Sequence, residues 1–510
     1  MPVYNTANIN KLYWASNEGF KRGRDPIGIQ NSSITVYGLL LPGLTNLTGR
    51  LRYYSFYCWL LYEYTKEYRR SGRKRTVRDQ QNFLRRAELA MAFLMEGRGA
   101  KSVVGSMHVD AKAFSVLQGC YDLKSSADFD YNPNHDKYWK YSTGAFGQYY
   151  LGSLVYLALV DVYEDSFKVL ERGEKLAQAF IESVSEKARD LFLTSVREGC
   201  LSKDDIEDLE EICLDMIIVR SPEWTMLNDV LVNKDLSGSS FRRDSIYLML
   251  DSIKQNVDVK RFPATLFLKY DKGDNDAALG WHYYYLCEAL HYCIETIFWM
   301  ILSNASKRNY CPVDSFLDLC QNSILKEEYD LSGFANNTLS EVVPVYDRDI
   351  VKRLDELVAT ARIGDYEKAS SKAAELLMCL YNQVTAMKSM YQDFERDYEI
   401  NQQFGYLTGF IKRYVENNLN NEVSTFARNV VRLVMADHTT SACRKMGRGQ
   451  SDLRKFLLED GMVVLVEIWK PQFTNPRTDS LIAFFEDLSY VKNGEITEIG
   501  EQFIDEYEKQ

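Results

Sequence analysis

Apolar residues recur at helical spacing along most of this 510-residue chain. Glycine and proline number only 28 and 10, so few positions force a helix to end. The pattern predicts helices over residues 46–69, 79–97, 147–163, 173–195, 203–216, 223–232, 241–256 and 275–303, with shorter helices continuing to 441. The sequence therefore predicts a mainly α fold.

Two stretches depart from helical spacing. The first forty residues are rich in glycine and proline, and we expect an irregular segment that wraps on the first domain. Residues 462–469 read Met-Val-Val-Leu-Val-Glu-Ile-Trp, and this apolar, β-branched run is the clearest strand signal in the chain. Strands are therefore expected to be few.

The chain is too long for one hydrophobic core, so we expect a multi-domain protein. Residues 1–200 are expected to form an N-terminal helical domain that ends in a winged-helix-like unit. Residues 201–400 form a central helical domain in this prediction. Residues 401–510 are expected to form a C-terminal domain that is partly helical and partly winged-helix-like.

The two winged-helix-like units are predicted from an internal similarity between residues 148–181 and 480–507. Each segment reads as a helix, a short polar stretch and a second helix that opens on a Gly-Glu pair, with an aromatic residue seven positions after the glycine. The first helix is expected to run to Tyr163 in one segment and to Val491 in the other. This order resembles the last third of a winged helix, where a recognition helix leads into a two-stranded wing.

Neither candidate recognition helix is basic. Residues 148–163 contain no lysine or arginine, and residues 479–490 contain three acidic side chains. Winged helices also serve as modules that bind proteins, and the fold alone does not decide between the two uses. Because cations are missing here, we expect these two units to contact proteins rather than a DNA groove.

The net charge of −11 makes the chain as a whole repel nucleic acid and anionic lipid, so any such contact needs a local basic patch. Residues 66–86 form the strongest one, with nine basic and two acidic side chains. Ser71-Gly72 places its centre on a turn between helices, from which side chains can reach phosphate groups. The candidate nucleic-acid-binding residues are Arg69, Arg70, Arg73, Lys74, Arg75 and Arg78. A solvated turn that pairs with acidic surface remains the alternative.

A second basic cluster surrounds Gly447 and Gly449, and glycine lets backbone N–H groups approach an anion closely. A further segment, Thr474-Asn475-Pro476-Arg477, comes just before a predicted helix N-terminus, which also favours anions. The second set of anion-binding candidates is Arg444, Lys445, Arg448 and Arg477. The alternative is a glycine turn with ordinary surface cations and an ordinary helix cap.

Two short patterns come near metal-binding or nuclease motifs. Glu288-x-x-His291 has the spacing found in di-iron bundles, but a second such motif is missing, so we expect a buried helix with satisfied polar residues. Asp460, Glu467 and Lys470 come near a nuclease pattern, but residues three apart on a strand lie on opposite faces.

No Walker, His-Glu-x-x-His or Gly-x-Ser-x-Gly motif occurs in the sequence. A Cys-His nucleophile pair stays open, because such partners meet only in the folded protein. We therefore predict no catalytic residues, no metal and no cofactor.

Compartment follows from cysteine usage and hydropathy. Ten cysteines are scattered without paired spacing, which favours a reducing cytoplasm. The N-terminus does not read as a signal peptide. The apolar run at residues 297–302 is far too short to span a bilayer, so no membrane contact is expected.

The most unusual segment is residues 39–64. Pro42-Gly43 ends what precedes it, Thr45 or Asn46 can cap the following helix, and that helix is apolar or aromatic on nearly every side. It nevertheless carries Arg50 and Arg52, and burying an unpaired guanidinium costs several kcal/mol. Either both arginines find acidic partners, or they reach a surface that binds an anion.

The motif Leu41-Pro-Gly-Leu-Thr followed by Arg50-x-Arg52-Tyr53-Tyr54-x-Phe-Tyr-x-Trp59 resembles the N-terminal signature of a group of uncharacterised bacterial proteins. The chain departs from the common pattern at Leu44, which precedes the threonine. Genes of that group are often found beside helicase, nuclease or ATPase genes of anti-phage defence loci. The resemblance implies this setting and carries no catalytic residue over to the chain.

Together these observations predict a cytoplasmic, non-catalytic subunit of a bacterial anti-phage or anti-plasmid defence complex. It would bridge an ATPase or nuclease partner and DNA, with the 66–86 patch on the phosphates. A complex with an SMC-type ATPase is one form of this prediction. Two alternatives remain: a nuclease with a non-standard active site, and a sensor that binds a phage protein.

Overall fold

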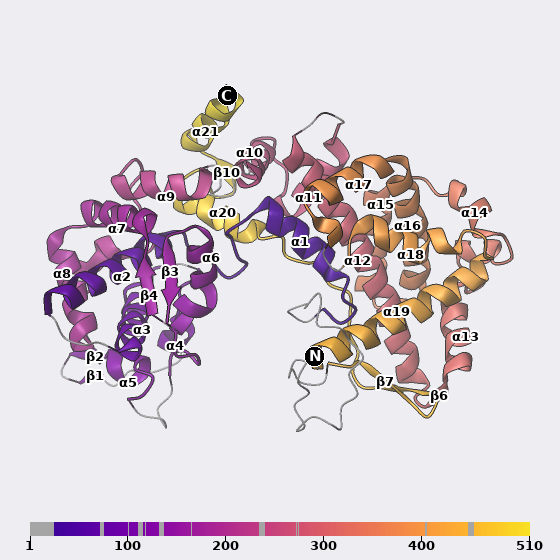
Figure 1. Cartoon of the computed structure of the whole chain (residues 1–510), viewed down its shortest axis with the longest axis horizontal. Helices are drawn as coiled ribbons and strands as arrows, with labels where there is room; N and C mark the ends of the chain where they lie inside the picture. The colour runs from indigo at the N-terminus through magenta and orange to yellow at the C-terminus, as the bar shows by residue number, and fades with distance from the viewer. Residues whose placement is uncertain are drawn as a thin grey trace. The chain divides into compact units, whose positions relative to one another are not determined.

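The computed structural model describes residues 25–71, 76–99, 101–110, 116–117, 119–131, 137–164, 166–233, 240–271, 273, 275–402, 405–446 and 453–509. It is 66% helix and 7% strand, so the prediction of a mainly α protein is confirmed (Figure 1). The chain divides into two compact units. Unit 1 comprises residues 1–37, 263–274 and 278–474. Unit 2 comprises residues 38–262, 275–277 and 475–510.

Both units therefore draw on stretches that are far apart in sequence. The division into residues 1–200, 201–400 and 401–510 concerns folding domains, which this grouping does not test, and it stays a prediction.

Unit 2 is built mainly from short helices around one buried helix. Its helices are α2 (Arg52–Ser71), α3 (Val77–Leu94), α4 (Ser106–Asp110), α5 (Leu123–Ala127), the π-helix η2 (Phe146–Tyr150), α6 (Leu151–Tyr156), α7 (Glu171–Ser183), α8 (Glu186–Glu198), the 3-10 helices η3 (Glu207–Ile212) and η4 (Val259–Arg261), α9 (Pro222–Val232), α10 (Phe241–Lys254), α20 (Thr478–Asp487) and α21 (Glu498–Glu508). The first half of α2 is buried on all sides, and α2 packs against α7 and α9.

Local sequence explains where several of these helices begin. The Thr76 hydroxyl caps α3 by accepting a hydrogen bond from the Asp79 N–H. The Asp79 carboxylate accepts one from the Thr76 N–H, and the two bonds form a capping box. The single helix expected over 173–195 is two helices, because Ser185 caps α8 through the Ala188 N–H. The polar side chain at the cap competes with continuation of α7 and fixes the break.

Among the described residues, the strands of unit 2 form three small antiparallel sheets. They are β1 (Val116–Leu117), β2 (Cys120–Asp122) and β5 (Cys200–Ser202) in one sheet, β3 (Val160–Tyr163) with β4 (Ser166–Val169), and β9 (Val491–Lys492) with β10 (Glu495–Ile496). A disulfide joins Cys120 and Cys200 between β2 and β5. Their separation of 80 residues gives no spacing signal, and only the pairing of β2 with β5 brings the two sulfurs together.

The internal similarity corresponds to two structural modules of the same order. We call α6–β3–β4–α7 the first hairpin module and α20–β9–β10–α21 the second hairpin module. The predicted helix over 147–163 was too long, because its last four residues form β3. In the second module the helix ends at Asp487, and Val491 begins β9.

The two hairpin modules share one close contact that explains their common glycine. In the first module, Gly173 lies so close to the Leu159 carbonyl oxygen that a Cβ would overlap it. In the second, Gly500 lies in the same way against the Tyr490 carbonyl oxygen. A helix can approach the base of the hairpin this closely only where its residue has no side chain.

Unit 1 is a helical bundle with a small sheet. Its helices are most of α1 (Gln30–Leu40), α11 (Phe262–Lys269) and α12 (Asp276–Lys307), then α13 (Val313–Ile324), η5 (Asp330–Phe334), α14 (Leu339–Val342), η6 (Val343–Val345), α15 (Ile350–Arg362), α16 (Tyr366–Ala386), α17 (Lys388–Asp397), η7 (Ile400–Gln402), α18 (Leu407–Tyr414), η8 (Glu416–Asn418) and α19 (Val423–Met446). Its strands are β6 (Cys311–Pro312), β8 (Met462–Leu465) and β7 (Phe456–Glu459), in that order across the sheet.

Helix α12 is the core of unit 1. It reaches α13 through Asn304 and Ser323, and it reaches α16 through the rings of Trp299 and Tyr366. Among the described residues it is the one helix that is long and apolar enough to cross a membrane, and its whole apolar window is buried inside the protein. The burial predicted for this helix is confirmed.

The N-terminal segment differs from its prediction. Residues 30–40 form a helix instead of an irregular segment, and residues 25–29 lie against α19 of unit 1. His438 contacts the Pro26 carbonyl oxygen at 2.8 Å, and Lys445 donates to the carbonyl oxygen of Asp25. These long-range contacts fix the segment, while residues 1–24 lie outside the described part of the chain.

The strand predicted over 462–469 is confirmed only for its first half. Strand β8 ends at Leu465, because the N–H groups of Val466 and Glu467 both donate to the Lys455 carbonyl oxygen. Beyond this point Trp469 turns toward Glu295 of α12 and donates to its carboxylate at 3.1 Å. A side-chain partner on another element therefore ends the strand early.

Candidate anion-binding sites

Arg52 of the signature segment lies inside unit 2 and pairs with Glu223 at the start of α9. Its Nε and Nη2 donate to the two carboxylate oxygens at 3.0 and 2.9 Å, and both side chains are 1% exposed. Its Nη1 donates to the carbonyl oxygens of Glu211 and Cys213. Ser55 also donates to Glu223, at 2.6 Å. This arginine is fully used by the fold.

Arg50 pairs with Asp487 of α20 at 2.8 Å and also donates to the Leu214 carbonyl oxygen. Asp487 accepts a second hydrogen bond from the Leu51 N–H at 2.7 Å. Burial raises the pKa of Asp487 to about 6, and Arg50 opposes that rise. Of the two alternatives for the signature arginines, the structure therefore shows acidic partners for both.

The loop before α2 is held from both hairpin modules. From the first module, Ser153 donates to the Gly43 carbonyl oxygen. From the second, Ser480 donates to the Thr45 carbonyl oxygen at 3.0 Å, and Arg477 donates to that of Leu41 at 2.8 Å. The helix expected from residue 46 therefore begins only at Arg52, because the loop is held in a non-helical form.

Tyr53 and Tyr54, the last two signature residues, are also interior. Tyr53 accepts a hydrogen bond from the Val104 N–H at 3.0 Å, and Tyr54 shares one with Ser153 at 2.7 Å. Burial raises the pKa of both phenols. The signature segment thus serves the structure of unit 2: Arg52, Tyr53 and Tyr54 are buried, and the Arg50 side chain is 13% exposed.

Two arginines at the C-terminal end of the 66–86 patch also serve the fold. Arg85 is fully buried in α3, donates to the carbonyl oxygens of Ala127, Trp139 and Tyr141, and lies over the Tyr138 ring. Arg86 donates both branches of its guanidinium to Asp128. Arg85 is buried and the Arg86 side chain is only 17% exposed, so both are largely used by the fold rather than by the patch.

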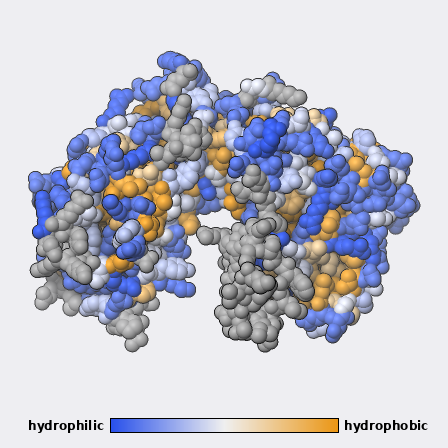
Figure 2. Space-filling view, in the orientation of Figure 1, coloured by the Kyte–Doolittle hydropathy of each residue, from blue (hydrophilic) through white to orange (hydrophobic). Residues whose placement is uncertain are grey.

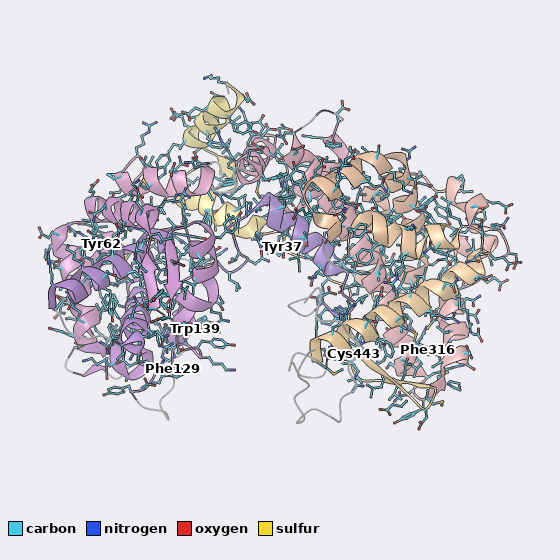
Figure 3. The ribbon with its side chains drawn as sticks, in the orientation of Figure 1. Tyr37, Tyr62, Phe129, Trp139, Phe316 and Cys443 are labelled. Carbon is cyan, nitrogen blue, oxygen red and sulfur yellow. A yellow bond between two sulfur atoms is a disulfide. The ribbon has the colours of Figure 1, made fainter. Side chains whose placement is uncertain are left out.

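The candidate nucleic-acid-binding residues fall at the end of α2, at the start of α3 and in the segment between these helices. Arg78 pairs with Asp130 at 3.0 Å and lies over the Phe129 ring, which Figure 3 labels. Arg70 near the end of α2 is exposed. The side chain of Arg69 and the whole of Arg73, Lys74 and Arg75 lie outside the described residues.

The second set of anion-binding candidates does not gather in one place. Arg477 belongs to unit 2, where it precedes α20 and donates to the Leu41 carbonyl oxygen. The helix N-terminus beside it is occupied by Asn475 and Asp479, which bond to each other at 2.9 Å. Arg448 lies outside the described residues. Arg444 and Lys445 are in unit 1, at the C-terminal end of α19.

Arg444 and Lys445 line a cavity of about 430 Å³ that is formed entirely by unit 1. We call it the basic pocket. Its lining comes from the N-terminal segment, from α18 with the residues before it, and from α19: Ile27, Gly28, Ile29, Gly405, Tyr406, Gly409, Phe410, Arg413, Asp437, Thr440, Ser441, Arg444 and Lys445. Cys443, labelled in Figure 3, marks this end of α19.

Three cations and one carboxylate face the basic pocket. Arg413 pairs with Asp437 at 2.6 Å, and Tyr414 donates to the other oxygen of the same carboxylate. Lys445 is 2% exposed, and burial lowers its pKa. The lining of the pocket therefore contains three cationic side chains, Arg413, Arg444 and Lys445, and one acidic side chain, Asp437.

The basic pocket has a polar floor and an aromatic wall. Ser441 is 6% exposed, and its hydroxyl has no hydrogen-bond partner among the described residues. The rings of Tyr406 and Phe410 lie against Gly409 and Gly405, where a Cβ would collide with them. A buried unsatisfied hydroxyl costs free energy unless a ligand or water meets it.

Among the pocket residues that the sequence did not single out are Arg413, Asp437 and Ser441. Arg413 comes from a different helix, and no spacing rule links it to Arg444. A signal was present on α19 itself, because His438, Ser441 and Lys445 are buried polar residues at helical spacing on an otherwise apolar face.

A second polar cluster lies on α12 of unit 1. His291 is fully buried between Glu288 and Glu295, with nitrogen–oxygen distances of 3.2 and 3.3 Å. Burial by itself would lower the pKa of His291, but the two carboxylates outweigh it and raise that pKa to about 10. Their remaining oxygens accept N–H groups of Thr474 and Gln472.

The Glu288–His291–Glu295 cluster is therefore a buried ion triad that fastens residues 469–474 to α12. A cavity of about 180 Å³ adjoins it. Within the described part of the chain, no group of three or more histidine, cysteine, aspartate or glutamate side chains is arranged to hold a metal ion.

The three residues that come near a nuclease pattern, Asp460, Glu467 and Lys470, do not share a partner among the described residues. Glu467 pairs with Lys455, while Lys470 lies over the Trp299 ring. Asp460 is in the turn between β7 and β8. Comparisons of this chain with protein-family models, with curated proteins and with solved structures find no match, so the sites above stand on their geometry.

Proposed function

We propose that this protein is a non-catalytic subunit of a bacterial anti-phage or anti-plasmid defence complex in the cytoplasm. In this proposal it bridges an ATPase or nuclease partner and DNA. The turn between α2 and α3 of unit 2 makes the phosphate contacts.

The proposal rests on which basic side chains of residues 66–86 have partners inside unit 2 and which are exposed. Arg85 and Arg86 are used inside unit 2, and Arg78 is paired with Asp130. Residues 69–75 keep five basic side chains and no acidic one, and Arg70 among them is exposed. A concentrated positive charge on an acidic protein is the feature that phosphate contact requires.

Contacts with a protein partner are proposed for the first hairpin module, as a winged-helix-like unit. Its outer residues Val155, Tyr156, Val162 and Tyr163 are 41%, 44%, 43% and 65% exposed. Figure 2 shows a hydrophobic patch on unit 2 near the strands that Figure 1 labels β3 and β4. Contiguous exposed apolar side chains are typical of protein interaction sites.

DNA binding tests the proposal. Fluorescence anisotropy with a labelled 30-bp duplex is measured for the natural chain and for the Arg73→Glu/Lys74→Glu/Arg75→Glu variant over a range of salt concentrations. The variant is expected to bind at least tenfold more weakly, and its salt dependence is expected to fall by up to about three counterions. The matched control reverses Lys168, Lys175 and Lys187, which are exposed on the same unit.

Equal binding by the natural chain and the turn variant would refute the proposal, as would affinity that hardly changes with salt. For the partner contact, a pull-down with the products of adjacent genes is compared between the natural chain and Val162→Asp. We expect the natural chain to retain an ATPase or nuclease that the Val162→Asp variant does not retain.

A further inference from the structure

We propose that the basic pocket of unit 1 binds a nucleoside phosphate, with the phosphate at Arg444, Lys445 and Ser441 and the base against Tyr406 and Phe410. This site is separate from the DNA contact proposed for unit 2. It does not depend on that proposal.

The size of the basic pocket suits a small molecule. Its volume of about 430 Å³ falls within the range of about 300–1,000 Å³ that is typical of ligand sites. It also combines apolar walls with a few polar groups, which is the composition that such sites share.

One side of the pocket provides what a phosphate group needs. Arg444 and Lys445 bring positive charge from α19, and Arg413 adds a guanidinium from α18. Hydrogen bonds from charged donors to phosphate are among the strongest in proteins. The Ser441 hydroxyl, buried and unpartnered among the described residues, can donate to a phosphate oxygen.

The other side of the pocket provides what a planar base needs. Tyr406, the residue before α18, and Phe410 in its first turn both line the cavity, and Ile27 lines it from the N-terminal segment. Because Gly405 and Gly409 carry no side chains, the Phe410 and Tyr406 rings can pack directly against the backbone there. Aromatic rings favour offset or edge-to-face contact with another ring, so a base gains more here than an aliphatic group would.

Enclosure favours a free nucleotide over duplex DNA at this site. Lys445 and Ser441 are 2% and 6% exposed, so they lie at the base of the cavity rather than on its rim. A backbone phosphate of a duplex is esterified on both sides and meets proteins through exposed cations. A terminal phosphate on a small molecule can enter the cavity.

The test is isothermal titration calorimetry of the full chain with ADP, GDP, ribose 5-phosphate, adenosine and inorganic phosphate. ADP or GDP is expected to bind at least tenfold more tightly than ribose 5-phosphate, adenosine or inorganic phosphate. Equal binding of inorganic phosphate and both nucleotides would overturn the assignment of the base, and no binding of either nucleotide would overturn the site.

Variants locate the binding. Ser441→Ala and Arg444→Gln are small changes, and each is expected to weaken nucleotide binding about tenfold or more, which corresponds to about 1.4 kcal/mol. The matched control is Arg432→Gln, an exposed arginine on the same helix, α19. Unchanged affinity in both pocket variants, with circular dichroism confirming their fold, would refute the proposal.

A cross-comparison keeps the two proposals distinct. The Arg444→Gln variant is expected to keep DNA binding, and the turn variant of unit 2 is expected to keep nucleotide binding. If Arg444→Gln abolished duplex binding, the pocket would hold DNA phosphates and the nucleotide assignment would be wrong.

Discussion

Arg52 and Glu223 form a bidentate ion pair in which both side chains are 1% exposed. The pair joins the first turn of α2 to the first turn of α9, and the guanidinium also satisfies two backbone carbonyl oxygens. A guanidinium stays protonated at any working pH, so its burial is tolerated only because all these acceptors surround it.

Removing one partner of this pair should be strongly destabilising. Arg52→Met leaves the Glu223 carboxylate buried without a cation, and we expect a loss of about 3–5 kcal/mol in the free energy of unfolding. Urea denaturation followed by circular dichroism measures it. Arg98→Met is the control, because Arg98 pairs with Glu210 and Asp215 at the surface and should cost about 1 kcal/mol or less.

A double variant, Arg52→Met/Glu223→Met, should recover part of the loss, because it removes the uncompensated charge. Recovery stays partial, since the carbonyl oxygens of Glu211 and Cys213 still lack their donor. A single-variant cost as small as that of Arg98→Met would contradict the interpretation of this pair as the anchor of unit 2.

The buried triad on α12 predicts a protonated histidine well above neutral pH. The pKa of His291 is raised from 6.5 to about 10, so the folded state binds a proton that the unfolded state releases above pH 6.5. The resulting stability is complete below pH 6.5 and is lost between pH 6.5 and 10, at up to about 1.4 kcal/mol per pH unit.

Nitrogen-15 NMR of labelled histidines measures the His291 protonation directly, because the chain has only five histidines and single substitutions assign them. Both ring nitrogens of His291 are expected to carry protons at pH 8. A neutral imidazole at that pH would show that the carboxylates do not control this residue.

His282 should titrate in the opposite direction. Its ring stacks on Phe267 and bonds to the Tyr391 hydroxyl at 2.8 Å, and burial lowers its pKa to about 4. As the pH falls below 6.5, His282 therefore takes up a proton in the unfolded state but stays neutral in the folded state. Stability is full above pH 6.5 and is lost as the pH falls toward 4.

The variant His282→Gln cannot take up that proton. The difference in unfolding free energy between the natural chain and this variant should shrink by about 1.4 kcal/mol per pH unit between pH 6.5 and 4. Denaturation at a series of pH values measures the difference. A difference that does not change with pH would refute the assignment.

The close contact in the hairpin modules predicts the effect of a single methyl group. Gly173→Ala and Gly500→Ala each place a Cβ against a backbone carbonyl oxygen, of Leu159 and Tyr490. Backbone cannot move aside cheaply, so we expect a loss of about 1–3 kcal/mol despite the better helix propensity of alanine.

Gly152→Ala in α6 is the matched control for the two module glycines, because nothing lies within 4 Å of its Cβ position. This change should be neutral or stabilising by up to about 1 kcal/mol. Thermal or urea denaturation compares the three variants. If Gly173→Ala behaved like Gly152→Ala, the contact would not be a constraint.

Much of the architecture could be read from local sequence. Helical spacing predicted helices over residues 46–69 and 275–303, and the structure contains them as α2 and α12 with shifted ends. The repeated Gly-Glu pair indicated two modules of one order, although it did not show that residues 160–163 form a strand. Short apolar runs suit a helix or a strand equally, and only pairing with β4 decides for the strand.

The sequence by itself determined the helical class and the order of the modules, because spacing, caps and glycines act over a few residues. Only the tertiary structure decided the roles of the charged residues. Arg52 became an internal anchor through Glu223, which lies 171 positions away along the chain, and Lys445 met the N-terminal segment 420 positions away. The role of a buried charged residue depends on the partner that it contacts. When that partner is far away in the sequence, no local pattern predicts it.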